Sequence, residues 1–513
     1  MSKFSEEIKK VIEESEMTLL SLSDASGLSV DHISKMRRGV RLPQDTEKVQ
    51  KLIIALQRSE EESRKLMTLY RIERMGDEEW KCMKGIQQLL EYGNKLPECV
   101  FNDGENDKHI AETDSSFSWL HASSVCVSDV ITMNVGCVGG GDIKVLHNRS
   151  EVFSFLQKIL PQTRGTLYMF TGEMSETIIE LLAMHLQRDD FRCEHLFSLK
   201  TLREKSGSLY NIRYVNQIMP LICSGKNYQP YYDYEEKGTA FLSNWLISEH
   251  WAVGLQKDME GGIVEWEEEK LAWIRQQYEN RKKNKRQLLL QFSDIYQWGE
   301  WLVENRSQYR AETVSGCVRP QDVKNHYIEY EPCMMMQITE ETLQKHLLLP
   351  EQAKAEAIAL FKVRHEQEMQ VGNVKFFTRK GMERFAKTGR ISQFSDLIYT
   401  PLTVPERIYY LRCFLNCIRQ SPQNTYMLDE RQINVSFRTF VFSTVSLMHN
   451  EFTLMIGREG AEYVSICEQG ISEKLSKFCY MLESGEMVCT QEECVKAVKK
   501  VIAELEVMEK SKN

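Results

Sequence analysis

The hydrophobic positions near the start of the chain recur three or four residues apart, which is the spacing of one helix face. In the first predicted helix, over residues 4–14, these positions are Phe4, Ile8, Val11 and Ile12. Two short helices are predicted next, over residues 19–26 and 30–38, because Thr18 and Ser29 are favoured N-cap residues. The start of the chain is therefore predicted to be helical.

The link between the second and third predicted helices has the composition of a tight turn. Gly27 ends the second helix, where a left-handed backbone costs glycine nothing. Ser23 is small where the two helices must approach closely. The apolar positions of the pair are Leu22, Leu28, Ile33 and Met36. Together these features predict a helix-turn-helix unit.

The segment over residues 25–43, ASGLSVDHISKMRRGVRLP, resembles the Xre/Cro-like phage-repressor family of transcription regulators. The similarity covers roughly residues 4–58 and includes the Gly-Leu-Ser turn, the Ile-Ser pair and the closing Arg-Gly and Leu-Pro. In that family the second helix of the pair enters the major groove of DNA. The resemblance implies that double-stranded DNA is contacted by Ser29, Val30, Asp31, His32, Ser34, Lys35, Arg38 and Arg41. Of these, Arg38 and Arg41 are expected to grip phosphates.

Two positions depart from the family pattern. Leu19 stands where the family often has a glutamine that touches the DNA backbone. Asp31 lies at a base-reading position, where it would repel phosphate and could only accept a hydrogen bond, for instance from cytosine N4. The alternative is a helical module used only for protein contacts.

The helical pattern continues beyond this unit. A fourth helix is expected to begin at Asp45 or Thr46, and further helices are expected over residues 59–75 and 77–92. Repressors of this type usually bind two half-sites as dimers. The later helices either couple the head to a homodimer or simply close the small domain. Residues 97–116 have the composition of a linker.

From about Phe117 strands and helices alternate, which predicts a mixed α/β remainder. The expected fold class is an N-terminal all-α helix-turn-helix domain followed by a large mixed α/β (α+β) region. The expected domains are residues 1–75 as the DNA-binding domain, 76–116 as connecting helix and linker, 117–320 as an α/β effector or dimerisation domain and 321–513 as an α+β C-terminal domain. Whether the last two form one domain or two is left open.

Composition narrows the class of protein. The net charge is −9, so DNA would have to be bound through a local positive patch. The 14 cysteines include no CxxC pair, and the first ten residues contain no signal peptide, which together favour reduced thiols and a cytoplasmic location. No run of about eighteen apolar residues predicts a membrane span.

The sequence offers no recognisable catalytic pattern. There is no HExxH and no Gly-x-Ser-x-Gly. The glycine-rich stretch over residues 136–141 lacks the Lys-Ser/Thr of a phosphate loop. The stretch over residues 165–199 resembles halves of phospholipase-D-like folds, but the His-x-Lys-x4-Asp pattern of that family is absent, so a domain of that kind would be inactive. We expect no enzyme activity, no metal site and no cofactor.

Three further features have a functional and a structural interpretation. The basic run RKKNKR at 281–286 could contact DNA, but flanking acids favour a solvated helix face. Cys333 and the adjacent residues Met334–Met336 could bind a soft metal, but core packing is favoured. His195 beside Glu194, and His250 beside Glu249, are more typical of surface pairs than of acid/base couples.

The resulting hypothesis is a DNA-binding transcription regulator whose larger region senses a small-molecule or peptide effector and dimerises. The alternatives are a non-enzymatic protein-interaction scaffold and an enzyme with a DNA-targeting head.

Overall fold

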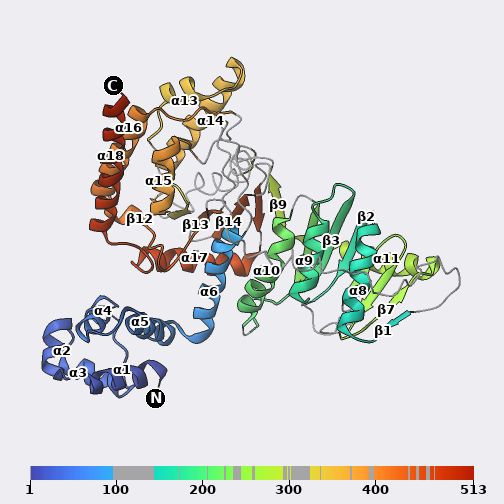
Figure 1. Cartoon of the computed structure of the whole chain (residues 1–513), viewed down its shortest axis with the longest axis horizontal. Coiled ribbons are helices and arrows are strands. Elements are labelled where there is room, and N and C mark those ends of the chain that lie inside the picture. The colour runs from blue at the N-terminus through green and yellow to red at the C-terminus, as the bar shows by residue number, and fades with distance from the viewer. Residues whose placement is uncertain are drawn as a thin grey trace, which may run out of the picture. The chain divides into compact units, whose positions relative to one another are not determined.

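The structure is a computed structural model. It describes residues 2–44, 46–95, 144–172, 174–204, 206–224, 227–234, 244–256, 260–292, 297, 301, 324–334, 337–369, 372–391, 398–436, 439–445, 450–457, 463–466 and 468–512. The expected linker at 97–116 and the glycine-rich stretch at 136–141 lie outside these residues. The fold class is confirmed, because an all-helical N-terminal region precedes a mixed α/β region (Figure 1).

Five helices form the N-terminal head, and each expected helix is present. Their bounds are α1 (Lys3–Glu14), α2 (Leu19–Ser26), α3 (Val30–Arg37), α4 (Thr46–Ala55) and α5 (Glu60–Met75). Thr18 and Ser29 cap α2 and α3 as predicted, and Ser59 begins α5 with a reciprocal capping box to Glu62. These caps fix where the helices begin through contacts within three residues.

The head has its own apolar core. Tyr70 of α5 is fully buried, its ring centroid lies 5.5 Å from that of Phe4, and its hydroxyl donates to the Pro43 carbonyl at 2.8 Å. The other fully or nearly fully buried members are Ile8, Val11, Ile12, Leu22, Leu28, Ile33, Met36, Val49, Leu52, Ile53, Leu56 and Leu66. The apolar positions identified from helical spacing are therefore the ones that meet inside.

The chain divides into two compact units that are discontinuous in sequence. The first unit comprises residues 1–94, 197–239 and 286–513, and the second comprises residues 95–196 and 240–285. The boundaries expected from the sequence at 75/76, 116/117 and 320/321 stay predictions.

The second unit contains alternating strands and helices. In chain order they are β1 (Lys144–Leu146), α8 (Arg149–Ile159), the 3-10 helix η3 (Leu160–Gln162), β2 (Gly165–Phe170), α9 (Glu176–His185), the greater part of β3 (Phe191–Leu199), β5 (Trp245–Ile247), β6 (Ala252–Leu255), β7 (Gly262–Glu265) and α11 (Glu268–Lys282). Strands β2 and β3 are parallel, with Leu167 opposite Cys193, and β5, β6 and β7 are antiparallel neighbours. These elements show the alternation of strands and helices that the sequence predicts after Phe117.

After the head, the first unit continues with α6 (Asp77–Glu91) and the 3-10 helix η1 (Tyr92–Lys95). Its later elements are α10 (Gly207–Cys223), β4 (Tyr228–Tyr234), β8 (Arg286–Gln287), β9 (Leu289–Phe292), β10 (Lys324–Ile328), α13 (Glu340–His346), α14 (Glu351–Met369), β11 (Gly372–Phe377), α15 (Arg379–Thr388), α16 (Val404–Gln420), the 3-10 helix η6 (Pro422–Asn424), β12 (Thr425–Met427), β13 (Thr439–Val445), β14 (Asn450–Gly457), β15 (Tyr463–Ile466), α17 (Gln469–Glu483) and α18 (Gln491–Lys512). Helices α6, α10 and α17 pack against one another.

Two sheets organise the strands. One has eight strands in the order β1-β7-β6-β5-β2-β3-β4-β8, and the other has seven in the order β12-β11-β10-β13-β14-β15-β9. In the seven-stranded sheet, β10, β11 and β12 run parallel while β13, β14, β15 and β9 pair antiparallel. Helices α15, α16 and α18 bury a separate core that includes Phe377, Phe385 and Phe414.

One predicted strand is shorter than expected. The pattern predicts extended backbone over residues 327–337, but β10 ends at Ile328 and a turn follows, in which the Gln337 N–H donates to the Met334 carbonyl at 2.9 Å. Pro332 lies in this stretch and has no N–H for a ladder.

Candidate nucleic-acid interface

The turn between α2 and α3 is held by two small residues. Gly27 adopts the left-handed conformation, with φ 70° and ψ 13°, and its N–H donates to the Ser23 carbonyl at 2.9 Å. The buried Ser26 hydroxyl donates to the Leu22 carbonyl at 2.6 Å and accepts from the Leu28 N–H at 3.2 Å. The sequence identified the glycine, whereas the role of Ser26 depends on its burial and needed the structure.

Helix α3 turns one face inward and the other outward. Ile33 and Met36 are fully buried in the head core. Of the residues expected to contact DNA, five are exposed: Ser29, Val30, Asp31, Arg38 and Arg41. The other three, His32, Ser34 and Lys35, are half-buried. The eight residues therefore lie on one short helix, on its N-cap and on the segment that follows it, with none of them in the core.

Ser29 and His32 form the N-terminal cap of α3. The Ser29 hydroxyl accepts from the His32 N–H at 3.3 Å and lies 3.1 Å from His32 Nδ1. The cap uses one of the two hydroxyl lone pairs. Ser29 thus positions the helix first, and any contact with DNA is a second role.

Asp31 and Lys35 are an ion pair on the exposed side of α3, with 2.8 Å between Asp31 Oδ2 and Lys35 Nζ. The hydrogen bond from Lys35 lowers the pKa of Asp31. The pair occupies the i,i+4 spacing at which helical side chains meet. Lys35 therefore carries a neighbouring carboxylate, which weakens its pull on phosphate.

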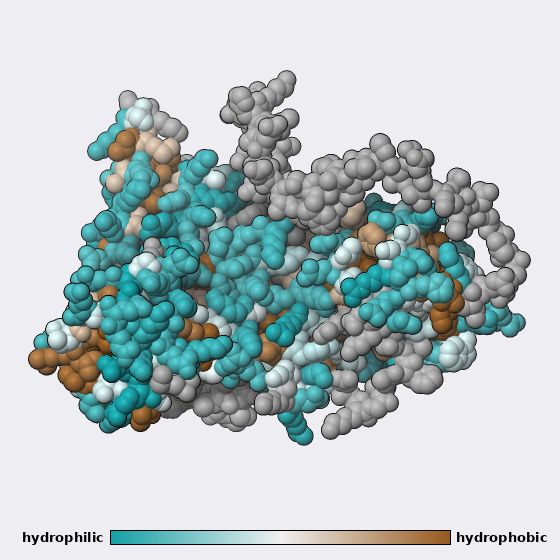
Figure 2. All heavy atoms as spheres, turned by 60° about the horizontal axis from the view of Figure 1, so that its bottom comes forward, coloured by the Kyte–Doolittle hydropathy of each residue, from teal (hydrophilic) through white to brown (hydrophobic). Residues whose placement is uncertain are grey.

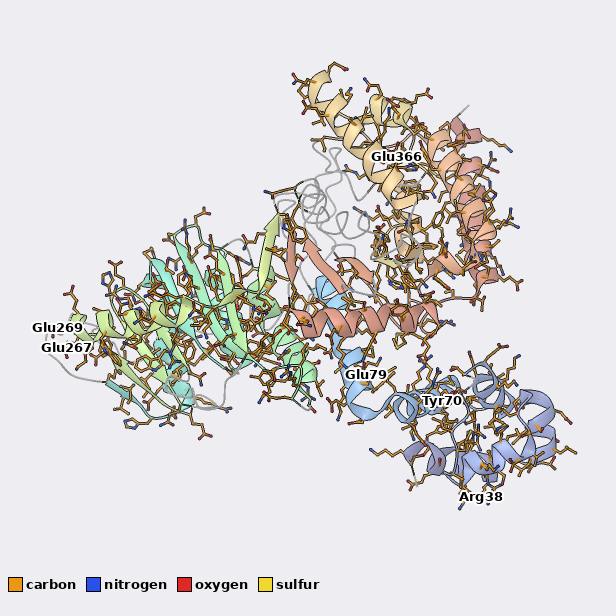
Figure 3. The ribbon with its side chains drawn as sticks, turned by 180° about the vertical axis from the view of Figure 1, so that it is seen from behind. Arg38, Tyr70, Glu79, Glu267, Glu269 and Glu366 are labelled. Carbon is orange, nitrogen blue, oxygen red and sulfur yellow. The ribbon has the colours of Figure 1, made fainter. Side chains whose placement is uncertain are left out.

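Positive charge gathers at the end of α3. Residues 29–41 hold four cations, Lys35, Arg37, Arg38 and Arg41, against the single acid Asp31. Arg38 Nε donates to the Ser34 carbonyl at 3.3 Å, and Figure 3 shows Arg38 at the outer edge of the head. Gly39, at φ 70°, then reverses the chain toward Arg41. This arrangement suits an anionic surface such as a phosphate backbone.

Leu19 has a structural explanation for its departure from the family pattern. It is half-buried and packs against the head core, so it contributes to folding. Its neighbour Leu20 is 64% exposed, as is Ile54 of α4. Among the described residues Val40 and Val507 are each 67% exposed as well, and the face shown in Figure 2 is mostly hydrophilic.

The basic run at 281–286 is partly neutralised within its own unit. Lys282 Nζ lies 2.5 Å from Glu194 Oε2, and the Arg281 guanidinium lies 4.7 Å from the centre of the Phe170 ring. Arg281 and Lys282 are therefore half-buried against β2 and β3, so the run is only partly a solvated helix face.

The expectation of a surface pair is wrong for His195, which is buried, and agrees with His250, which is exposed beside Glu249. His195 is fully buried, its Nε2 lies 2.6 Å from Thr171 Oγ1, and burial lowers its pKa to about 3. His250 lies 3.9 Å from Glu249, with both side chains mostly exposed. Cys333 and Met334 are buried, whereas Met335 and Met336 lie outside the described residues.

The described residues contain neither a cluster of metal ligands nor a helix that could span a membrane. No group of three or more His, Cys, Asp or Glu side chains among them could hold a metal ion. None of the helices in this part of the chain is long and apolar enough to cross a membrane.

The end of α5 carries a contact that the sequence did not reveal. Arg71 Nε lies 3.1 Å from Glu486 Oε2 in the segment between α17 and α18, and Arg71 Nη1 donates to Gln432 Oε1 at 3.3 Å. Arg74 Nη1 lies 4.0 Å from Glu486 Oε1. More than 340 residues separate these partners along the chain, so no local pattern could pair them.

Comparison with known proteins does not assign this chain to a family. No family model matches the chain, and none of the curated proteins matches it. Among solved structures it is similar to TrmBL2, an archaeal chromatin protein with a novel mode of DNA binding, at 10% identity and a TM-score of 0.20, over 56% of this chain and 94% of that one. It is also similar to a polyphosphate kinase from Porphyromonas gingivalis, at 9% identity and a TM-score of 0.21, over 71% of this chain and 56% of that one. A phosphatidylserine synthase from Haemophilus influenzae gives 7% identity and a TM-score of 0.21, over 72% and 94%. Similarity at this level establishes neither fold nor activity.

Proposed function

We propose that this protein is a DNA-binding transcription regulator of the Xre/Cro-like type. Helix α3 enters the major groove, where the exposed Val30 can contact a thymine methyl group and Asp31 can accept from cytosine N4. Arg38 and Arg41 hold the phosphate backbone. The larger region dimerises and senses an effector, and the protein acts in the cytoplasm without catalysing a reaction.

One observation carries the proposal. A left-handed glycine joins two short helices, and the second of them buries Ile33 and Met36 while presenting its other residues outward beside four cations. That is the arrangement in which a recognition helix can lie in a groove while its core face holds it rigid.

The test is an electrophoretic mobility shift with the full chain and the duplex upstream of its own gene. The double variant Lys35→Ala with Arg38→Ala is expected to bind at least about tenfold more weakly, since two phosphate or base contacts are lost. The matched control is Lys9→Ala with Lys10→Ala, which removes the same charge from exposed positions of α1.

Equal affinity of the two double variants would contradict α3 as the recognition helix. Absence of a shift for the unaltered chain, with that duplex and with unrelated duplexes at low salt, would favour the scaffold alternative.

A further inference from the structure

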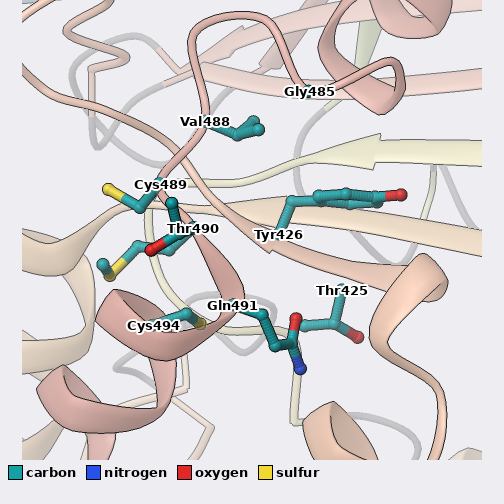
Figure 4. A pocket seen from close by; sticks show the side chains of 9 residues that line it. Thr425, Tyr426, Gly485, Val488, Cys489, Thr490, Gln491 and Cys494 are labelled. Atoms are coloured by element: carbon teal, nitrogen blue, oxygen red, sulfur yellow. The ribbon is translucent and has the colours of Figure 1, made fainter. Parts of the chain in front are cut away.

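A cavity of about 270 Å³ lies beside segment 485–490, whose Glu486 contacts Arg71 in α5 of the head. It is open on one side and is lined by strand β12 (Thr425–Met427), by the segment 485–490 that joins α17 to α18, and by the first turn of α18 (Figure 4). Its size is slightly below the range usual for small-molecule sites, roughly 300–1,000 Å³. It therefore suits a compact ligand.

The side chains that line the cavity define the chemistry of that ligand. None of them is charged. Met427, Val488 and Cys489 offer apolar or soft surface, Tyr426 offers an aromatic ring, and Thr425 offers a hydroxyl. Such a lining favours a small uncharged molecule that has an apolar ring and one hydrogen-bonding group.

Backbone hydrogen bonds join the two walls of the cavity, which are β12 with the residues that follow it and segment 485–490. The Cys489 N–H donates to the Met427 carbonyl and the Asp429 N–H donates to the Met487 carbonyl, each at 2.8 Å. Met487 has a φ of 57°, a conformation that L-residues adopt rarely. Residue 486 therefore lies in a tightly constrained segment whose neighbours face the cavity.

Each wall also reaches the DNA-binding head. From one wall, Glu486 pairs with Arg71 of α5 at 3.1 Å. From the other, Asp429 Oδ2 accepts from Gln432 Nε2 at 2.9 Å, and Gln432 Oε1 accepts from Arg71 Nη1 at 3.3 Å. Arg71 thus receives a contact from both sides of the cavity.

The ion pair between Arg71 and Glu486 is weak enough that a small displacement of Glu486 would change its strength. The side chains of Arg71 and Glu486 are only 14% and 10% exposed. Although Arg71 Nε and Glu486 Oε2 are close, neither buried atom makes a directed hydrogen bond. A buried ion pair with incomplete hydrogen bonding gains little over its desolvation cost. Movement of segment 485–490 would therefore change the strength of the ion pair that connects this segment to α5.

We propose that this cavity binds a small uncharged aromatic molecule and that Glu486 transmits its occupancy to α5. This inference rests on the proposed function, because it makes the molecule an effector of DNA binding.

Binding is tested by protection of Cys489 from iodoacetamide in the full chain, read by peptide mass spectrometry. Benzyl alcohol is the uncharged probe and benzoate is its anionic counterpart. At about ten times its dissociation constant, benzyl alcohol is expected to slow alkylation about tenfold, since only the empty site reacts. Benzoate is expected to leave the rate unchanged. No protection by benzyl alcohol, or equal protection by benzoate, would overturn the assignment.

Coupling is tested by hydrogen exchange of the α5 amides without DNA, so it is independent of whether the head binds DNA. Benzyl alcohol is expected to change exchange in α5 by about threefold or more. Glu486→Gln is expected to produce the altered exchange by itself and to abolish the response, whereas the exposed Glu492→Gln on α18 should respond normally. Protection of Cys489 without any change in α5, or a normal response in Glu486→Gln, would refute the coupling.

Discussion

Lys35 Nζ lies 2.8 Å from Asp31 Oδ2, one turn apart on the outward side of α3. The pair places a carboxylate on the side expected to meet DNA. Asp31→Asn is expected to raise affinity for non-specific duplex several-fold, because it removes repulsion and releases Lys35 for phosphate. If Lys35 gains one phosphate contact, the slope of log affinity against log salt should steepen by about 0.9.

The matched control for Asp31→Asn is Glu47→Gln on α4, which also breaks an exposed i,i+4 pair, with Lys51 at 2.6 Å. Affinities are measured by fluorescence anisotropy across a salt series. An equal gain from both variants would mean that only net charge matters, and not the position on α3.

Gly27 gives a test of the turn. Its φ is 70°, and a Cβ added there would meet no atom within 4 Å. Gly27→Ala is therefore expected to destabilise the head by about 1–2 kcal/mol through backbone conformation alone. Hydrogen exchange in α2 and α3 reports the change. Gly172→Ala, also in open space but without a positive φ, is the control and should leave its surroundings stable.

His195 predicts a pH dependence of the second unit. Burial lowers its pKa from 6.5 to about 3, so between these values the unfolded chain binds a proton that the folded chain does not. Stability is therefore expected to fall as the pH falls from about 6.5 toward 3, by up to about 1.4 kcal/mol per pH unit from this residue. In urea unfolding measured across this pH range, His195→Gln should remove this contribution to the pH dependence of the unfolding free energy. His250→Gln, at an exposed position, should leave that pH dependence unchanged.

Arg407 ties together the end of α15 and the start of α16. Its guanidinium donates to the carbonyls of Ala386, Lys387, Thr388 and Leu402 at 2.8–3.2 Å. Arg407→Lys cannot reproduce this planar fork and leaves acceptors unpaired, so a loss of about 2 kcal/mol is expected in denaturant unfolding. The control Arg412→Lys, exposed on the same helix, should change stability by less than about 0.5 kcal/mol. Equal losses would show that the fork is dispensable.

The head illustrates what local sequence signals can settle. The expected second helix coincides with α2 at both ends, because Thr18 caps it and Gly27 terminates it. The apolar positions of α1 are buried as their spacing indicates. These features depend on contacts within a few residues, so composition and spacing are sufficient to predict them.

Helix α10 illustrates where such signals fail. It was not predicted over residues 207–223, since it contains Pro220 and buries side chains on several sides, from Asn211 to Ile222. A proline inside a helix removes a backbone donor and usually kinks or ends the helix, so Pro220 argues against a continuous helix here. Its packing against α6 and α17 compensates, and only the folded chain supplies those partners.

Helix α3 follows the same division. The sequence by itself determined the turn at Gly27, the cap at Ser29 and the cations near the end of α3, because each is a property of neighbouring residues. Only the tertiary structure decided the strand order of the two sheets, the discontinuous units and the pairing of Arg71 with Glu486. Those depend on contacts between segments that are separate along the chain, whose formation is governed by burial and shape that no local pattern encodes.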